Sequence, residues 1–388
     1  MDSDFFIVNG TLVTESSLVP NASLHIKYGK VEKISGSQAN LGRDAVKVDV
    51  DGAYVSPGFI DLHVHGTGGY DSTDATVTAL TGMREALVPY GVTTLAPTLL
   101  SSPPDRARAF LEAVRFEVSA KGEGARIVGA HLEGPFLNPS KRGVHLEEDL
   151  KPASVEAFNQ LADGYRDLIK IMTLAPELDG ALAVIGECKK VGIVSSIGHS
   201  NASYCEARKG VQAGISHSTH TFNAMSTLQA RAPGTVGAVL SSDNVYAEVI
   251  ADGIHVHPSN VNLITQIKGA TRTILVTDAV KPAGTGIKEF VIGGIEATVR
   301  DGAVLTSEGR LCGSILTMDK AIRNLRTWTN RSMPEIVRMA SLNPAEQLGI
   351  AERTGSLVEG KDADIVILDR ELNVKATFVR GVKQYAAG

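Results

Sequence analysis

Residues 57–66 read Pro-Gly-Phe-Ile-Asp-Leu-His-Val-His-Gly, a short apolar run that ends in two histidines and a glycine. Side chains alternate between the two faces of a strand, so His63 and His65 would point to the same side. Two imidazoles at the carboxyl end of a strand are well placed to bind a metal ion. A hydrogen-bonded pair of core histidines would give the same short pattern, so its interpretation depends on the rest of the chain.

Downstream of this run, short apolar segments alternate with stretches of helical spacing. Eight strand candidates, the run itself being the first, alternate in this way, which predicts an α/β fold of the (β/α)8 TIM barrel type. A doubly wound open sheet is the alternative, and the lack of a Gly-x-Gly-x-x-Gly motif at the first helix weakens it. The predicted strands are Gly58–Val64, Val92–Ala96, Arg126–His131, Ile169–Leu174, Ile193–Ile197, Ile215–Thr219, Val245–Ile250 and Thr273–Thr277.

After the eighth strand, the pattern predicts a β-hairpin insertion near residues 287–314 and then two helices, at Leu316–Trp328 and Pro334–Leu348. The second of these helices carries a proline in its first turn and ends before Gly349, as helix ends prefer.

Both ends of the chain read as short strands joined by turns. Near the N-terminus, Phe5–Val8 leads to Asn9-Gly10, a strong hairpin signal. The C-terminal candidates are Ala363–Leu368 and Ala376–Val379. Each set is too small to fold alone, so we expect one small β-sandwich domain formed from both termini rather than two separate appendages. The expected domains are residues 1–56 with 353–388, and the barrel at 57–352.

The bulk composition is that of an ordinary globular protein, with 43% hydrophobic and 21% charged residues in 388. A net charge of −5 argues against a surface for nucleic acid or anionic membrane. The cysteines Cys188, Cys205 and Cys312 are odd in number, lack zinc-knuckle spacing and read as reduced thiols. No basic segment follows Met1 and no uncharged apolar stretch reaches membrane length, so we expect a cytoplasmic protein.

Metal-competent side chains follow five of the eight predicted strands, at the end where TIM barrels carry their active sites. They divide into one group from strands one and eight and another from strands five and six, with a glutamate after strand three able to bridge them. Such donors suit one or two divalent ions, Zn²⁺ or Fe²⁺ first, and so favour hydrolysis of an amide or ester. The candidate ligands are His63, His65, Glu133, His199, His220 and Asp278.

Two further histidines are weaker candidates. His217 and His220 are three residues apart, which on a strand would place them on opposite faces, so we expect only His220 in the site. His131 shares a face with Glu133 but lies one layer deeper, so we expect it to support the ligands rather than to bind metal.

These residues belong to longer motifs that resemble the amidohydrolase superfamily and, within it, the N-acetylglucosamine-6-phosphate deacetylase family. The motifs follow that family's order along nearly the whole chain. Many dihydroorotase-like members bridge their metals with a carboxylated lysine on strand four, but Ile169–Leu174 has no lysine at its end and Glu133 replaces it. The motifs are His63-Val64-His65, His131–Phe136, Gly198–Ser200, His220–Met225, Arg231–Gly234, Ala251–His255, Thr277–Ala279 and Gly313-Ser314.

The resemblance implies hydrolysis of the acetamide of N-acetyl-D-glucosamine 6-phosphate, in amino-sugar catabolism. Asp278 would act as general base and then as acid, and His145 would polarise the acetyl carbonyl. Arg231 would anchor the phosphate through its guanidinium fork. Further substrate contacts would come from Val144, Asn223, Ala224, Asp252, His255, Leu311 and Gly313.

The resemblance also implies a homodimer or homotetramer in which a neighbour supplies part of the phosphate pocket. Family members differ in whether strand one carries both histidines, and the pair here favours two metal ions over one. Cys312 stands where the family often has a small residue without a thiol. The alternative activities are deacetylation of N-acetylgalactosamine 6-phosphate or of another acylated amine. A scaffold without catalysis is disfavoured because every expected ligand is present.

Overall fold

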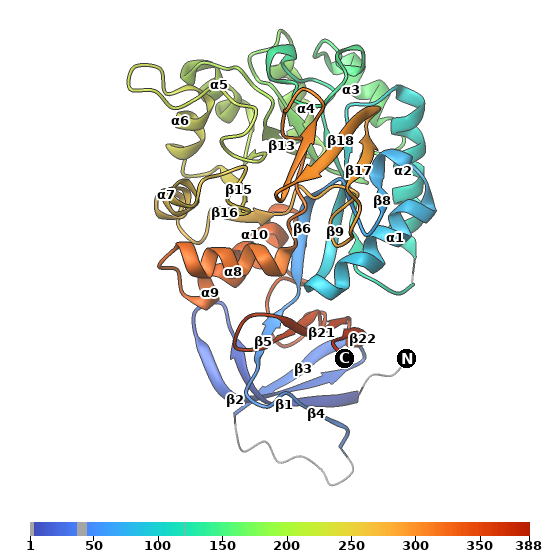
Figure 1. Cartoon of the computed structure of the whole chain (residues 1–388), viewed down its shortest axis with the longest axis vertical. Helices are drawn as coiled ribbons and strands as arrows, with labels where there is room; N and C mark the ends of the chain where they lie inside the picture. The colour runs from blue at the N-terminus through green and yellow to red at the C-terminus, as the bar shows by residue number, and fades with distance from the viewer. Residues whose placement is uncertain (1–3, 37–44, 121) are drawn as a thin grey trace.

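A barrel of eight parallel strands dominates the computed structural model, which describes residues 4–36, 45–120 and 122–388 (Figure 1). The prediction of a (β/α)8 barrel is confirmed. Its last strand meets its first at the candidate site, since Asp278 N donates to His63 O and His65 N donates to Ala279 O, both at 2.8 Å. The strands are β6 (Phe59–Val64), β9 (Val92–Leu100), β10 (Arg126–Ile127) with β11 (Ala130–Glu133), β12 (Ile169–Leu174), β13 (Val194–Ile197), β14 (His217–Ser218), β15 (Tyr246–Ile250) and β16 (Thr273–Val276).

Helices surround the barrel and bury an apolar stripe against it, from Leu80 and Met83 of the first helix to Ile336 of the ninth. The sequence did not reveal α6, because all seven of its residues are buried and leave no amphipathic pattern. The helices are α1 (Val77–Leu87), α2 (Pro104–Ser119), α3 (Val155–Ala162), α4 (Ala181–Lys190), α5 (Tyr204–Ala213), α6 (Gly234–Leu240), α7 (Pro258–Lys268), α8 (Met318–Trp328), α9 (Met333–Ala340) and α10 (Leu342–Gln347).

Two predicted elements are divided in the structure. The third strand is broken at Gly129, where a Cβ atom would lie 2.4 Å from Leu168 O, and it resumes as β11 and runs on to Glu133. The prediction of one helix over Pro334–Leu348 is wrong. It ends at Ala340 and restarts after Ser341, because Pro344 has no N–H to donate to the carbonyl four residues earlier and its ring would clash there.

Strands from both termini form one eight-stranded sheet in the order β22-β21-β20-β5-β1-β2-β3, with β4 beside β1. Phe5 on β1 and Phe378 on β21 are three strands apart in this order, yet their rings stack at 5.7 Å, so the sheet curls over a core of its own. The strands are β1 (Asp4–Val13), β2 (Leu18–Lys27), β3 (Lys30–Ser35), β4 (Lys47–Asp49), β5 (Tyr54–Pro57), β20 (Ile365–Leu368), β21 (Val374–Val379) and β22 (Val382–Ala386).

The hairpin predicted at Asn9-Gly10 is wrong, because β1 continues through it. Asn9 adopts φ +58° and the register with β2 shifts between Ile7 and Gly10, so the pair forms an irregularity within one strand. A side chain at Gly10 would lie 2.4 Å from Val55 Cγ2, which explains the glycine as a close approach between β1 and β5.

The terminal sheet lies at the amino-terminal end of the barrel strands, since β5 leads directly into β6 (Figure 1). We propose that it forms a domain of its own, with boundaries near residues 56 and 353. Residues 1–3 and 37–44 of that segment lie outside the described part of the chain. Helices long and apolar enough to cross a membrane are not found among the described residues.

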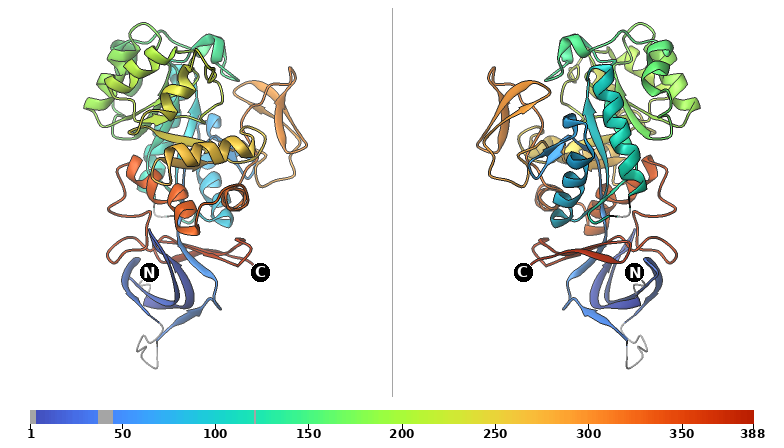
Figure 2. Two further views of the ribbon diagram at one scale, coloured as in Figure 1. Left: turned by 90° about the vertical axis from the view of Figure 1, so that its left-hand side faces the viewer. Right: turned by 90° about the vertical axis from the view of Figure 1, so that its right-hand side faces the viewer.

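A separate three-stranded antiparallel sheet follows β16, within the interval predicted for the insertion. Figure 2 shows it in orange beside the barrel. It packs Ile292 and Val304 against Leu100, Val144 and Val280 near the carboxyl ends of the barrel strands. Its strands are β17 (Glu289–Ile292), β18 (Ile295–Arg300) and β19 (Ala303–Thr306), and a short pair, β7 (Gly66–Thr67) with β8 (Tyr70–Asp71), follows β6.

Candidate metal centre and active site

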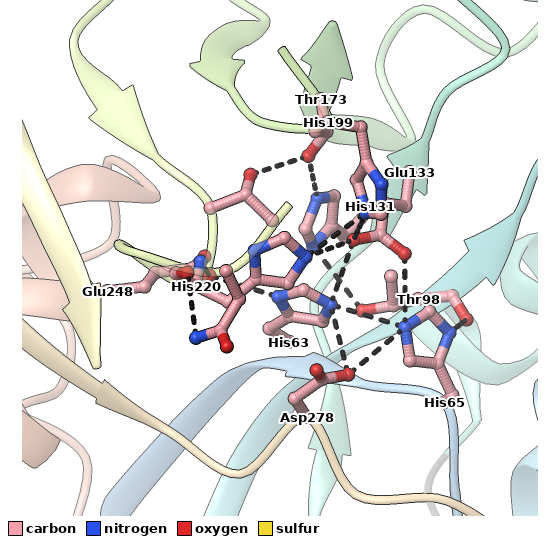
Figure 3. A network of polar contacts seen from close by, with 12 residues as sticks. His63, His65, Thr98, His131, Glu133, Thr173, His199, His220, Glu248 and Asp278 are labelled. Carbon is pink, nitrogen blue, oxygen red and sulfur yellow. Dashed lines mark hydrogen bonds and ion pairs between the residues drawn. The ribbon is translucent and has the colours of Figure 1, made fainter. Parts of the chain in front are cut away.

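All six predicted metal ligands meet at the carboxyl end of the barrel, and each is at most 6% exposed (Figure 3). In the first group, His63 Nε2 lies 3.2 Å from His65 Nε2, and Asp278 Oδ1 lies 3.4 and 3.3 Å from these two atoms.

In the second group, Glu133 Oε1, His199 Nε2 and His220 Nε2 form a triangle with every side at 3.1 Å. Glu133 also reaches the first group, with Oε1 at 3.5 Å from His63 Nε2 and Oε2 at 3.3 Å from His65 Nε2. Its two oxygens therefore stand between the two groups, as the sequence predicted for a bridge.

Hydrogen bonds behind three of the histidines determine which ring nitrogen carries the proton. His65 Nδ1 donates to Thr98 O, His199 Nδ1 donates to Lys141 O, and His63 Nδ1 faces the carboxylate of Glu248 at 2.9 Å. With the proton on Nδ1, each Nε2 turns a lone pair toward the centre. Two neutral rings in this state cannot hydrogen-bond to one another through Nε2, so a cation between them, either a metal ion or a proton, would satisfy the facing lone pairs.

The spacing of these donors fits a transition-metal ion. Zinc–nitrogen and zinc–oxygen bonds of about 2.0–2.1 Å imply donor atoms about 3.3 Å apart around a tetrahedral ion. The separations of 3.1–3.5 Å within and between the two groups match this value. The residues present therefore fit a divalent metal, in keeping with a donor set of imidazoles and carboxylates.

The electrostatics of the centre also favour bound positive charge. Burial opposes the charged form of His63, but Asp278, Glu248 and Glu133 outweigh it and raise its pKa to about 9. The pKa of His65 rises to about 10 against the same burial, through its contacts with Asp278 and Glu133. Burial acts to raise the pKa of Glu133, yet His199 and His63 hold it well below its usual range. The centre thus keeps its carboxylates ionised and attracts cations.

Three of the site residues have positive φ angles, which non-glycine residues rarely adopt. His199, His220 and Asp278 have φ values of +47°, +30° and +47°. Each of them stands two residues after the last residue of its strand, β13, β14 or β16, where the chain turns away from the barrel. Strain of this kind in non-glycine residues concentrates at functional sites.

His145 lies beside this centre, and its Nε2 is near Glu133 but has no hydrogen-bond partner among the described residues. Ser101 N donates to His145 Nδ1 at 3.1 Å, so the neutral ring carries its proton on Nε2, which is 3.3 Å from Glu133 Oε2. Burial and the nearby His199 lower the pKa of His145 to about 4 despite Glu133, which keeps the ring neutral. His145 is therefore an uncharged N–H donor at the edge of the centre.

A cavity of about 300 Å³ opens over these groups. Its wall includes an apolar cluster of Leu100, Val144, Val280, Ile292 and Cys312, and polar side chains such as Ser140, Lys141 and Asn223. Seven of the predicted substrate residues line it: Val144, His145, Asn223, Ala224, His255, Leu311 and Gly313.

Two predicted substrate residues are not on the cavity wall. Asp252 instead holds His255, accepting from its Nδ1 at 2.6 Å and from its backbone N at 2.8 Å. Arg231 is exposed on the loop before α6 and has no hydrogen bond or ion pair among the described residues. Arg231 is thus separate from the cavity within this single chain.

Three residues near the site were not identified from the sequence. Glu248 is buried in β15, next to His63. Asp61, on the first barrel strand, accepts from Thr277 Oγ1 at 2.5 Å, just after the last barrel strand. Alternation along β6 puts Asp61 on the same face as His63, a signal that was available. Lys141 lines the cavity and carries the one ammonium or guanidinium group among the described lining residues.

His217 and His220 do not lie on opposite faces, as a regular strand would place them, although His220 lines the cavity and His217 does not. Strand β14 is only two residues long, and the turn that follows brings both His217 and His220 inward, at different depths. His217 Nε2 contacts Glu248 Oε1 at 2.7 Å below the centre. His131 lies deeper than Glu133 as predicted, and it is hydrogen-bonded to Leu62 O and Thr173 Oγ1.

Comparison with known proteins agrees with this architecture. An N-acetylglucosamine-6-phosphate deacetylase of Bacillus subtilis is 37% identical over 98% of this chain and 97% of its own length. An N-acetylgalactosamine-6-phosphate deacetylase of Escherichia coli O157:H7 is 32% identical over 95% of this chain and 96% of its own. The crystal structure of N-acetylglucosamine-6-phosphate deacetylase from Pasteurella multocida superposes with a TM-score of 0.94 at 33% identity, covering 99% of this chain and 100% of that one.

The family model described as "Amidohydrolase family" matches residues 54–383, which include every residue of the centre and the whole cavity wall. With this match and relatives of nearly equal length, the chain belongs to the amidohydrolase family.

Proposed function

We propose that this protein hydrolyses the acetamide of N-acetyl-D-glucosamine 6-phosphate to D-glucosamine 6-phosphate and acetate. The observation that carries the proposal is that one cavity contains three chemical groups. They are the N–H donor of His145, the carboxylate of Asp278 and the cluster of candidate metal ligands. The names of the similar proteins specify the acylated amino-sugar phosphate.

One or two divalent ions would be held by His63, His65 and Asp278, and by Glu133, His199 and His220. When bound, they supply Lewis acidity and bring the pKa of a water near neutrality, with Zn²⁺ or Fe²⁺ the ions that these donors suit first.

Asp278 is the proposed general base and acid. Burial works to raise its pKa, but His63 and His65 lower it below the usual range, so the carboxylate is ionised and able to accept a proton. It takes a proton from the attacking water as the carbon–oxygen bond forms. It then returns that proton to the sugar nitrogen as the carbon–nitrogen bond breaks, so one water is consumed and acetate and amine are released.

The neutral Nε2–H of His145 donates to the acetyl oxygen as negative charge develops there. His255, oriented by Asp252, and the polar wall at Asn223 and Ala224 bind the sugar and its phosphate. We propose Arg231 as a phosphate contact, delivered to the cavity of a neighbouring subunit.

The test is acetate release by protein supplied with Zn²⁺ or Fe²⁺, with Asp278→Asn as the matched control. Four substrates run in parallel: the phosphorylated and unphosphorylated N-acetylglucosamine and N-acetylgalactosamine. Fast turnover of the phosphorylated gluco sugar, lost in Asp278→Asn with metal content retained, is the expected result. Preference for the galacto epimer would favour the second candidate, which the Escherichia coli relative supports. Absence of turnover on all four by metal-loaded protein would overturn both.

We also propose a homodimer or homotetramer located in the cytoplasm. The exposed Arg231 and the 49% exposed Leu228, on the loop before α6, support a subunit contact there. Sedimentation velocity of the metal-loaded protein at micromolar concentration tests the assembly, and a monomer at every concentration would contradict it.

A further inference from the structure

Glu248 occupies a position where a charge is costly. It lies in the middle of β15 with its side chain fully buried, where barrels are normally filled by branched apolar residues. An ionised carboxylate in a protein interior costs several kcal/mol unless it is well compensated, and apolar replacements of such groups are often no less stable. A contribution to folding stability is therefore a weak explanation for a glutamate at this position.

The two oxygens of Glu248 serve three donors. Oε2 accepts from His63 Nδ1 and from the backbone N of His220, both at 2.9 Å, while Oε1 faces His217 Nε2 at 2.7 Å. The carbonyl oxygen of Glu248 also accepts from Thr221 N at 3.0 Å. Figure 3 shows this carboxylate behind His63 and His220, on the side away from Glu133.

The geometry points to Glu248 as a positioning residue that holds one ligand of each metal group through a single oxygen, Oε2. For His63, it fixes both the ring orientation and the tautomer that leaves Nε2 free. For His220, it binds the backbone N–H at a residue with φ +30°, a conformation that needs support from its surroundings. The two groups would thus depend on one buried carboxylate as well as on the bridging Glu133.

The rival explanation is that Glu248 only forms a buried ion pair with His217. The two explanations differ in which variants weaken metal binding. In Glu248→Gln, the amide oxygen can still accept from His63 and His220. Its NH₂ can donate to His217 if that ring moves its proton to Nδ1, which has no hydrogen-bond partner among the described residues. Glu248→Leu removes both side-chain acceptor oxygens with little change of size.

The experiment measures the dissociation constants of Zn²⁺ for the full-length protein by competition with a chelating dye, and the visible absorption spectrum of the Co²⁺-loaded form. Loss of a group that orients a metal ligand typically weakens binding roughly 10–100-fold. We expect Glu248→Leu to show such a loss with an altered Co²⁺ spectrum, and Glu248→Gln to stay within roughly tenfold of the native protein. The matched control is His217→Gln, which disturbs Oε1 alone and should leave metal affinity close to native.

Native metal affinity in Glu248→Leu would overturn the inference. The inference would also be overturned, in favour of the ion pair, if all three variants lost Zn²⁺ affinity and the size of each loss followed the drop in thermal stability of the metal-free form. The three variants are Glu248→Leu, Glu248→Gln and His217→Gln. If Glu248→Leu does not fold, Glu248→Asp replaces it, since the shortened side chain withdraws the carboxylate and should weaken binding while keeping the charge. The inference rests on the metal centre of the proposed function, but neither readout uses a substrate, so its failure and that of the deacetylase proposal are distinguishable.

Discussion

The backbone amide of Ser101 determines which nitrogen of His145 carries the ring proton, because an N–H group can only donate. With Nδ1 accepting from Ser101 at 3.1 Å, the donor of the neutral ring is Nε2. Replacing a donor that stabilises a developing oxyanion typically costs roughly 10²–10³ in kcat. We expect His145→Asn to lower kcat by this factor while KM and metal content change little, as measured by steady-state kinetics and metal analysis. Loss of metal in this variant would instead place His145 among the ligands.

We expect Lys141 to offer a second cation for the phosphate of the proposed substrate. Its side chain lines the cavity, and its carbonyl, which accepts from His199 Nδ1, survives any substitution of the side chain. One charge-assisted hydrogen bond contributes about 1.5–3 kcal/mol, or roughly 10–100-fold in affinity. We expect Lys141→Ala to raise KM by this factor for the phosphorylated sugar and to leave the unphosphorylated sugar unaffected. Arg231→Ala measured in the same way is the comparison, and a KM change in that variant alone would exclude Lys141 as a phosphate contact.

The barrel strands and the positions of the candidate ligands could be predicted because both follow from simple repeats. Alternation on β6 gave His63 and His65 a common face, and the rule that TIM-barrel sites lie at strand ends located Glu133, His199, His220 and Asp278. Where the backbone leaves ideal geometry, alternation fails. The turn after the two-residue β14 is the reason that His217 points inward with His220.

Glu248 was missed for a different reason. Nothing in a predicted strand shows that one of its charged residues is buried and paired with residues from other strands. The alternation in β15 does put Glu248 in phase with Tyr246 and Ile250, but its partners, His63 and His217, come from β6 and β14. Long-range pairing of this kind appears only when the barrel closes.

The β17–β19 insertion supplies part of the apolar wall of the cavity. Ile292 of β17 packs with Leu100, Val280 and Cys312, and all four line the cavity. The acyl methyl is the main apolar group of the proposed substrate, so we expect it to pack on this wall. Ile292→Ala should therefore raise kcat/KM for the N-propionyl relative to the N-acetyl sugar, by up to about fourfold for one buried methylene of about 0.8 kcal/mol. Val291→Ala, at an exposed neighbour on the same strand, is the control. An unchanged ratio in Ile292→Ala would place the acyl group elsewhere.

The candidate metal centre joins the first and last strands of the barrel. His63 and Asp278 belong to one ligand group and also connect β6 to the segment after β16 through their backbones. A ligand present at about 100 times its dissociation constant stabilises the folded state by about 2.7 kcal/mol. We expect a chelator to lower the melting temperature measured by calorimetry. Zn²⁺ should restore it and Mg²⁺ should not, because Mg²⁺ prefers oxygen ligands. An unchanged melting temperature after verified metal removal would contradict this prediction.

Without metal, protons can occupy the same centre, which makes the stability of the chelated protein depend on pH. Burial opposes charge on His63 and His65, but the carboxylates around them raise their pKa values to about 9 and about 10, compared with about 6.5 in an unfolded chain. The folded state then binds these protons more tightly. Their contribution to stability is complete below pH 6.5 and is lost as the pH rises through about 9 and 10.

We therefore expect the melting temperature of the chelated protein to fall between about pH 6.5 and 10, and to fall more steeply than that of the Zn²⁺-loaded protein, in which the metal replaces these protons. Calorimetry of both forms across this range measures the two slopes. Groups elsewhere in the chain titrate in both forms, so their contributions cancel when one slope is subtracted from the other. Only the groups of the centre contribute to the difference between the slopes. Parallel slopes would show that the metal-free histidines hold no additional protons, and that the carboxylates of the centre are neutralised in another way.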